Sequence, residues 1–162
     1  MVAETPRQPK QHSWLYAWLP VLLGTALIAV SSSSYFSAQD TSGPFRWVYE
    51  HIFGRVSNDH WGRIHFLLRK CCHFFGYAAF GLLWLRGWWL SLPRTRFLQD
   101  AALAVLGAGI VASGDEFHQH FLPSRTGSPW DVLLDCSGAL TVQLIVYIYL
   151  RIFRPKQLDR AG

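Results

Sequence analysis

The apolar residues of this chain are concentrated in four long runs, and this segregation constrains the fold more than any other feature. An apolar stretch of about 17 to 25 residues can cross a bilayer as a helix. The sequence lacks the alternation of apolar and polar residues that is typical of a membrane barrel. It therefore predicts an all-α fold, a four-helix transmembrane bundle. The runs are residues 14–30, 71–92, 101–114 (with Phe97 and Leu98 extending the third) and 136–150.

The first run has a competing interpretation as a secretory signal peptide. Arg7 and Lys10 precede it, as the basic residues of a signal peptide would. The candidate cleavage sites are poor, because the bulky Tyr35 and Phe36 stand at the −3 positions, where small residues are needed. We therefore expect an uncleaved first span.

The net charge of +5 is distributed unevenly between the two ends of the predicted bundle. Four spans place both termini on one side, whose segments carry nine Lys or Arg and three Asp or Glu. The opposite side carries six Lys or Arg and seven Asp or Glu. Because basic residues are enriched in cytoplasmic loops, this predicts a multi-pass protein of the cytoplasmic membrane with both termini cytoplasmic. The basic excess thus indicates orientation, and no nucleic-acid partner is expected.

We expect one membrane domain, residues 14–153, between a disordered cytoplasmic tail at 1–13 and a cytoplasmic tail at 154–162. Between the first two spans lies a long external segment. Ser42, Gly43 and Pro44 look like a helix start there, and apolar residues follow at helical spacing over 45–56. This pattern predicts an interfacial amphipathic helix outside the membrane. A further helix start at Ser57 or Asn58 leads into the second span.

A stripe of small residues recurs every fourth position in the third run: Ala104, Ala108 and Ala112. Small residues at this spacing share one helix face and let two helices approach closely. The stripe fits packing within one bundle and packing between copies equally well, so the oligomeric state stays open.

Polar residues gather at the ends of the four spans that face outward in this topology. Ionisable residues beside apolar spans are costly to desolvate and are therefore candidates for a functional site. A network of ion pairs that only locks the spans together is the structural alternative. The converging residues are Ser31 to Ser34, Arg69, Lys70, His73, Asp115, Glu116, His118, Gln119, His120, Arg125, Asp131 and Asp135.

Two motifs carry a resemblance to the VanZ-like family of small integral membrane proteins. They are RKCCHFFGYAAFG at 69–81 and DEFHQHFLPSRTGSPWDVLLDCSG at 115–138. The resemblance covers about residues 14–153. Arg69 departs from the family pattern, since many relatives carry an acid there, and Asp135 stands where Asn is frequent. The matching positions are Lys70, His73, Tyr77, Asp115, Glu116, Gln119, Pro123, Arg125, Asp131, Asp135 and Gly138.

The resemblance implies a role in the cell envelope rather than a known reaction. The family's namesake is associated with low-level resistance to teicoplanin, a lipid-bearing glycopeptide antibiotic. The resemblance therefore implies interaction with lipid-linked or glycopeptide molecules at the outer leaflet, and an effect on teicoplanin susceptibility. The expected partners are the lipid bilayer and such a ligand, and no cofactor is implied.

Two functional interpretations of the polar residues remain open. In the first, Arg125 and Lys70 hold a phosphate or carboxylate, and Gln119 and the carboxylates take sugar or amide donors. This binding set is Lys70, His73, Tyr77, Gln119, Arg125, Asp131 and Asp135. In the second, a membrane enzyme acts on a lipid head group, with His73, Asp115 and Glu116 as catalytic candidates and Arg125 as the electrostatic clamp.

Metal and disulfide chemistry are weaker alternatives. The residues considered as metal ligands are His73, Asp115, Glu116, His118, His120 and Asp131, and their spacings lack the paired i, i+4 motif of zinc proteases. We expect no metal. A disulfide between Cys72 and Cys136 at the outer end is conceivable, although nothing in the sequence supports it.

Overall fold

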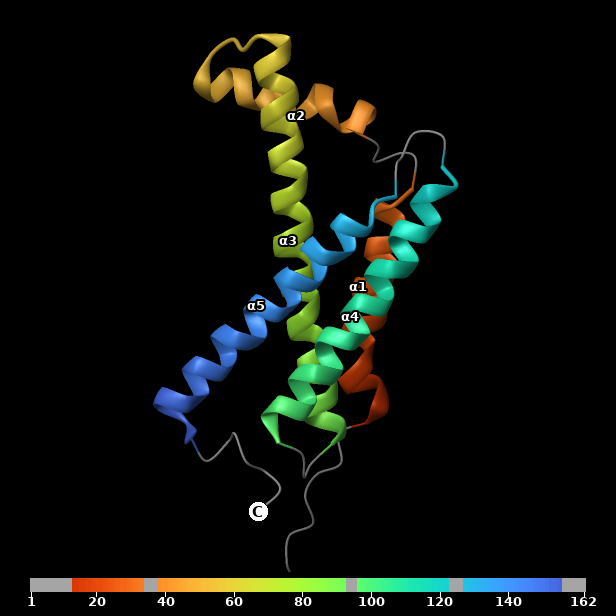
Figure 1. The fold of residues 1–162 in the computed structure, drawn as a ribbon, viewed down its shortest axis with the longest axis vertical. Helices are drawn as coiled ribbons and strands as arrows, with labels where there is room; N and C mark the ends of the chain where they lie inside the picture. The colour runs from red at the N-terminus through yellow and green to blue at the C-terminus, as the bar shows by residue number, and fades with distance from the viewer. Residues whose placement is uncertain (1–12, 34–37, 93–95, 123–126, 156–162) are drawn as a thin grey trace, which may run out of the picture.

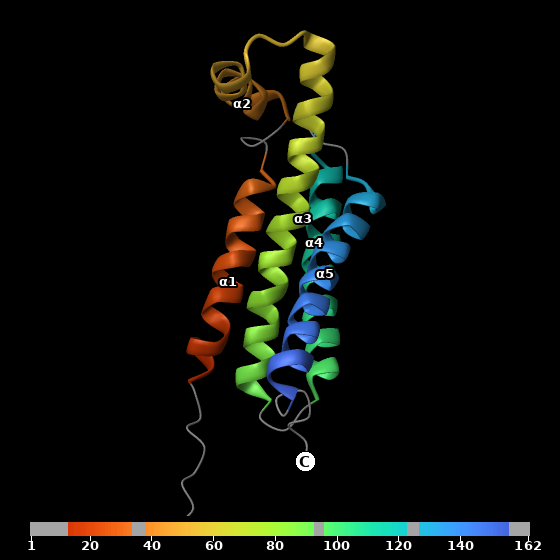
Figure 2. The ribbon, with the colours of Figure 1, turned by 90° about the vertical axis from the view of Figure 1, so that its left-hand side faces the viewer.

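The computed structural model describes residues 13–33, 38–92, 96–122 and 127–155, and these residues form an all-α structure of five helices. Four of them run alongside one another, whereas the fifth, α2, lies across one end beside the first turns of α3 (Figures 1 and 2). The start of α1 and the end of α5 lie at the opposite end from α2. The helices are α1 Trp14–Ser31, α2 Ala38–Phe53, α3 Asn58–Ser91, α4 Phe97–His120 and α5 Pro129–Phe153.

Three of the described helices, α1, α4 and α5, are long and apolar enough to cross a membrane. The extension of the third run to Phe97 is confirmed. The fourth apolar run starts at residue 136, and α5 begins before it, at Pro129, because proline fits the first helical position after Ser128. α3 lies outside this set of three, since polar residues such as His73 and Arg86 interrupt its apolar half.

The start and end of the external helix differ from the sequence prediction. α2 already begins at Ala38, so Pro44 lies inside it instead of at its start. A proline inside a helix removes only one backbone donor and clashes with one carbonyl, and this helix accommodates that cost. The helix ends at Phe53, before the predicted end at residue 56, because Gly54 adopts a left-handed φ of 89°.

Arg46 holds α2 against the start of α3. Its Nε donates to Glu50 Oε1 at 2.9 Å, its Nη1 to Asn58 Oδ1 at 2.8 Å, and its Nη2 to the Val56 carbonyl at 2.8 Å. The hydrogen bond from Arg46 holds the pKa of the Glu50 carboxyl below its usual value. The predicted start of the next helix is confirmed, because the Ser57 side chain caps α3 by accepting from the His60 amide.

Small residues allow α3, α4 and α5 to pack closely. The alanine stripe of the third run is fully buried within the chain, so it packs inside this bundle. A Cβ added at Gly107 would lie 2.6 Å from the Trp84 ring, and one added at Gly138 would lie 2.2 Å from the Phe74 carbonyl oxygen. At Gly138, α5 therefore approaches the backbone of α3 directly, whereas Gly107 of α4 makes room for the Trp84 ring of α3, as small residues permit in membrane proteins.

At the end opposite α2, α1 is attached to α3 through aromatic and arginine contacts. The Trp18 ring packs edge-on against Trp88 with centroids 4.8 Å apart, and its Nε1 donates to Ser91 Oγ at 2.9 Å. Arg86 Nη1 donates to the carbonyls of Tyr16 at 2.9 Å and Ala17 at 3.1 Å. At the end where α2 lies, a cavity separates α1 from α3.

Candidate functional site

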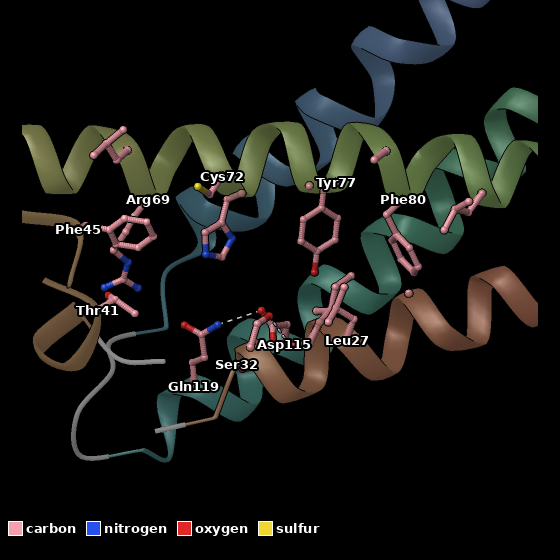
Figure 3. A pocket seen from close by; sticks show the side chains of 18 of the residues that line it. Leu27, Ser32, Thr41, Phe45, Arg69, Cys72, Tyr77, Phe80, Asp115 and Gln119 are labelled. Carbon is pink, nitrogen blue, oxygen red and sulfur yellow. Dashed lines mark hydrogen bonds between the residues drawn. The ribbon is translucent and has the colours of Figure 1, made fainter. Parts of the chain in front are cut away.

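A cavity of about 660 Å³ lies between α1, α3 and α4, with α2 at its outer end (Figure 3). α3 supplies one wall because its lining residues recur at three- and four-residue intervals and so share a helix face. Asp115 and Gln119 of α4 face this wall, and Thr41 and Phe45 of α2 lie at the outer end. The α3 wall includes His65, Arg69, Cys72, His73, Gly76, Tyr77, Phe80 and Leu83.

The cavity is apolar at its inner end and polar toward α2. Leu27 and Ile28 of α1 and Phe80 and Leu83 of α3 line the inner part. Figure 3 shows Arg69 closest to α2 and Gln119 next, with Asp115 deeper, between Gln119 and Leu27. Such a gradient suits an amphipathic molecule whose chain points into the bilayer and whose head group lies near the surface.

The polar wall contains buried groups with unused hydrogen-bonding capacity. Gln119 Nε2 donates to Asp115 Oδ2 at 2.9 Å, one helical turn away, and both side chains are buried. The Tyr77 hydroxyl and Ser32 Oγ belong to residues 3% and 2% exposed, and neither makes a hydrogen bond with the described residues. A buried polar group left unsatisfied costs about 1–3 kcal/mol, which a ligand hydroxyl or carbonyl would offset.

A second polar network connects α3 to α5 behind this wall. His73 lines the cavity, and its Nδ1 lies 3.4 Å from Oδ1 of Asp135, which is fully buried. One turn away, Lys70 forms an ion pair with Asp131. Asp131 and Asp135 are four residues apart, so both face α3. His73 therefore connects the cavity to this carboxylate pair.

Glu116 of α4 contacts the residues just before α5 and does not line the cavity. Its Oε2 accepts a hydrogen bond from the Ser128 amide at 2.8 Å, just before α5 begins. Its other oxygen, Oε1, is buried and makes no hydrogen bond among the described residues. A Cβ added at Gly127 would lie 2.3 Å from the Glu116 carbonyl oxygen, so a glycine is required at that approach. Glu116 thus fixes how the described part of the last loop meets α4.

The structure divides the predicted site residues into two groups. His73, Tyr77, Asp115 and Gln119 line the cavity. Lys70, Glu116, Asp131 and Asp135 lie in the adjacent networks. Pro123 and Arg125 fall outside the described residues.

Metal and disulfide chemistry find no support in the described part of the chain. His118 and His120 are exposed, and no three His, Cys, Asp or Glu side chains of the described residues come together as a metal site. The conceivable disulfide is not formed, because Cys71, Cys72 and Cys136 are all free thiols.

Several cavity residues were not assigned to a ligand from the sequence. Arg69 and Ser32 were among the converging polar residues, but neither was placed in the binding set. The sequence contains a pattern that could have identified Arg69 and His65. They precede His73 at intervals of four residues, which places all three on one helix face. For Thr41 and Phe45 no signal existed, because only the three-dimensional position of α2 brings them to the cavity.

These features define a class: a helical, multi-pass membrane protein with an amphipathic cavity and a carboxylate-rich network beside it. The chain belongs to the VanZ/LLP1 family, whose family model matches residues 15–152. This confirms the resemblance found in the two motifs. No curated protein and no solved structure matches the chain.

Proposed function

We propose that this VanZ/LLP1 protein acts in the cell envelope by binding a lipid-linked molecule at the outer leaflet, including a lipid-bearing glycopeptide. The observation that supports this most is the amphipathic cavity, which has an apolar inner end and unsatisfied buried hydroxyls above it. Pockets of about 300–1,000 Å³ are typical of sites for single small ligands, so a cavity of 660 Å³ suits a chain and part of a head group.

The proposal includes a four-span topology with both termini cytoplasmic. In it, the part of α3 after Lys70 is the second span. The support is that α3 runs antiparallel to α1 and reaches the opposite end of the bundle from α2 (Figure 2). The unequal distribution of Lys and Arg supports the orientation in the cytoplasmic membrane. The exposed apolar residues of α2, such as Trp47 and Ile52, suit a helix that lies at the outer interface.

An effect on teicoplanin susceptibility follows from this proposal through the lipid part of that antibiotic. A cavity of 660 Å³ accommodates one chain, and the glycopeptide core would remain at the membrane surface near α2. Susceptibility would then depend on how the protein competes for, or sequesters, the lipid-bearing molecule.

Filling the cavity tests the proposal. Gly76 lines it, and a Cβ added there meets nothing within 4 Å, so Gly76→Leu fills the space without a backbone clash. The matched control is Gly114→Leu, because Gly114 is an exposed helical glycine that is equally open and lies outside the cavity. We expect roughly tenfold less lipid to copurify with Gly76→Leu, measured by mass spectrometry of extracted lipids.

The Gly114→Leu control separates filling of the cavity from the general effect of placing a leucine at a helical glycine. Gly114→Leu is expected to retain the lipid, and cells that carry it should keep their teicoplanin susceptibility, whereas Gly76→Leu should change it. Equal lipid content in both variants and in the natural chain would contradict binding in this cavity.

A second candidate function is acid–base chemistry on the bound head group. The contact between His73 and Asp135 favours it, because a carboxylate that orients a histidine is a common arrangement for a general base. His73 also lines the cavity, so its ring is within reach of a bound molecule. The same lipid extracts separate the two candidates: a binding protein leaves the lipid mass unchanged, and an enzyme converts it.

A further inference from the structure

We propose that the lipid bound in this cavity carries an anionic phosphate, which Arg69 holds at the outer end while one chain occupies the inner end. This inference rests on the proposed function and names the chemical class of the ligand. It assigns the phosphate contact to Arg69, not to Lys70.

Arg69 is a cation that lines the cavity and has no hydrogen-bond or ion-pair partner among the described residues. Its side chain lies at the outer end near Thr41 (Figure 3). Among the described residues it makes no hydrogen bond and no ion pair, in contrast to the adjacent Lys70, which is paired with Asp131. His65 lines the same end, and burial, together with a smaller effect of the Arg69 charge, lowers the pKa of its ring and so disfavours a second positive charge there. None of the described residues that line this end is an anion, so an anionic group of a ligand would pair with Arg69.

The depth of Arg69 agrees with a lipid phosphate. It lies two residues before the apolar part of α3, which begins at residue 71, and so near the level where lipid head groups meet the hydrocarbon core. A guanidinium binds phosphate through two parallel hydrogen bonds, which makes arginine well suited to this contact.

The deeper polar groups suit the linkage between head group and chain. Tyr77 follows Arg69 by two helical turns, about 12 Å along the axis. There the Tyr77 and Ser32 hydroxyls can donate to an ester or amide carbonyl, and the Asp115 carboxylate can accept from a hydroxyl or amide N–H. Asp115 would repel a second anion at this depth. The polar order thus fits one phosphate outside, an uncharged linkage below it, and a chain beyond Phe80.

The size of the cavity suits one lipid chain with part of its head group. A volume of about 660 Å³ lies within the range of about 300–1,000 Å³ that is typical of sites for single small ligands. A second chain of a diacyl lipid would remain in the surrounding bilayer.

The test compares two lipids that differ only in the phosphate. The purified full-length chain, freed of lipid in a neutral detergent, is titrated with phosphatidylglycerol or with diacylglycerol of the same chains, and binding is measured by native mass spectrometry. Arg69→Gln removes the proposed contact. The matched control is Arg63→Gln, because Arg63 lies on the same helix but is exposed and outside the cavity.

We expect Arg69→Gln to lower the affinity for phosphatidylglycerol about ten- to a hundredfold, because a charge-assisted contact is lost. The affinity for diacylglycerol should stay unchanged. Arg63→Gln should change neither, and excess inorganic phosphate should not displace the lipid. Equal loss for both lipids, or equal affinity of the natural chain for both, would overturn the phosphate inference and leave lipid binding intact. Displacement by inorganic phosphate would show a free-anion site instead. If neither lipid binds the natural chain, the proposed function fails as well.

Discussion

The contact between α3 and α5 depends on the absence of a side chain at Gly138. A Cβ added there would lie 2.2 Å from the Phe74 carbonyl oxygen and 3.3 Å from the Ala78 amide nitrogen. Both neighbours are backbone atoms, so the helices must separate to relieve the clash. We expect Gly138→Ala to lower the free energy of unfolding by about 1–3 kcal/mol, the usual cost of overpacking, as measured by thermal unfolding in detergent.

The control for this prediction is Gly114→Ala. A Cβ at Gly114 meets nothing within 4 Å, and alanine is favoured over glycine in helices by about 0.5–1 kcal/mol. This variant should therefore be at least as stable as the natural chain. Equal stability of Gly138→Ala and Gly114→Ala would show that the α3–α5 approach is looser than described.

Part of the site could be predicted residue by residue, and the limit has a geometric cause. His73, Tyr77, Asp115 and Gln119 converge because helix periodicity and alternating spans bring their helix ends together. Adjacent residues on a helix, however, point about 100° apart. Only the packing of α1 and α5 on opposite sides of α3 decides that Arg69 faces the cavity and Lys70 faces Asp131.

At the scale of elements, α2 docks on α3 through a cluster that includes a buried histidine. Trp61 Nε1 donates to Ser42 Oγ at 2.7 Å, and His65 Nε2 lies 3.4 Å from Thr41 Oγ1. The His65 and Trp61 rings stack with centroids 5.5 Å apart. Burial, with a smaller contribution from the Arg69 charge, lowers the pKa of His65 from 6.5.

This lowered pKa predicts that acid weakens the docking of α2. As the pH falls through 6.5, the unfolded segment binds a proton before the folded one does, so stability declines until the folded His65 is also protonated. We expect faster hydrogen exchange of the α2 amides at about pH 5.5 than at about pH 7.5, beyond the intrinsic rate change. His65→Gln should remove this difference and His60→Gln, at an exposed position, should retain it. A pH effect that persists in His65→Gln would assign it to another group.

The existence of each helix was easier to predict than its ends. The apolar runs are sufficient for α1 and α4, because burial in lipid favours a helix wherever a run is long enough. The start of α5 depends on Ser128 and Pro129, and the start of α2 on whether the fold accommodates Pro44. These ends follow from local capping and docking, which a hydropathy pattern does not contain.

At the scale of the whole molecule, the unequal charge distribution and the antiparallel course of α3 support the proposed four-span topology. With α3 as a span, residues before it and residues after α5 lie on opposite sides of the membrane. If α3 did not cross, only the two spans α4 and α5 would lie between these residues, and both segments would be on the same side. The number of spans and the orientation are therefore testable with two reporter positions.

His60 at the start of α3 and Pro155 after α5 are exposed and suit such reporters. In a chain whose native residues Cys71, Cys72 and Cys136 are replaced by serine, His60→Cys should react with a membrane-impermeant maleimide in intact cells. Pro155→Cys should react only after permeabilisation, because positive segments stay cytoplasmic. The reverse pattern would invert the orientation, which would place the cavity's polar end at the inner leaflet. If both cysteines react from the same side, α3 does not cross the membrane. The cavity between α1 and α3 would then not lie at the depth in the bilayer that the proposal assigns to it.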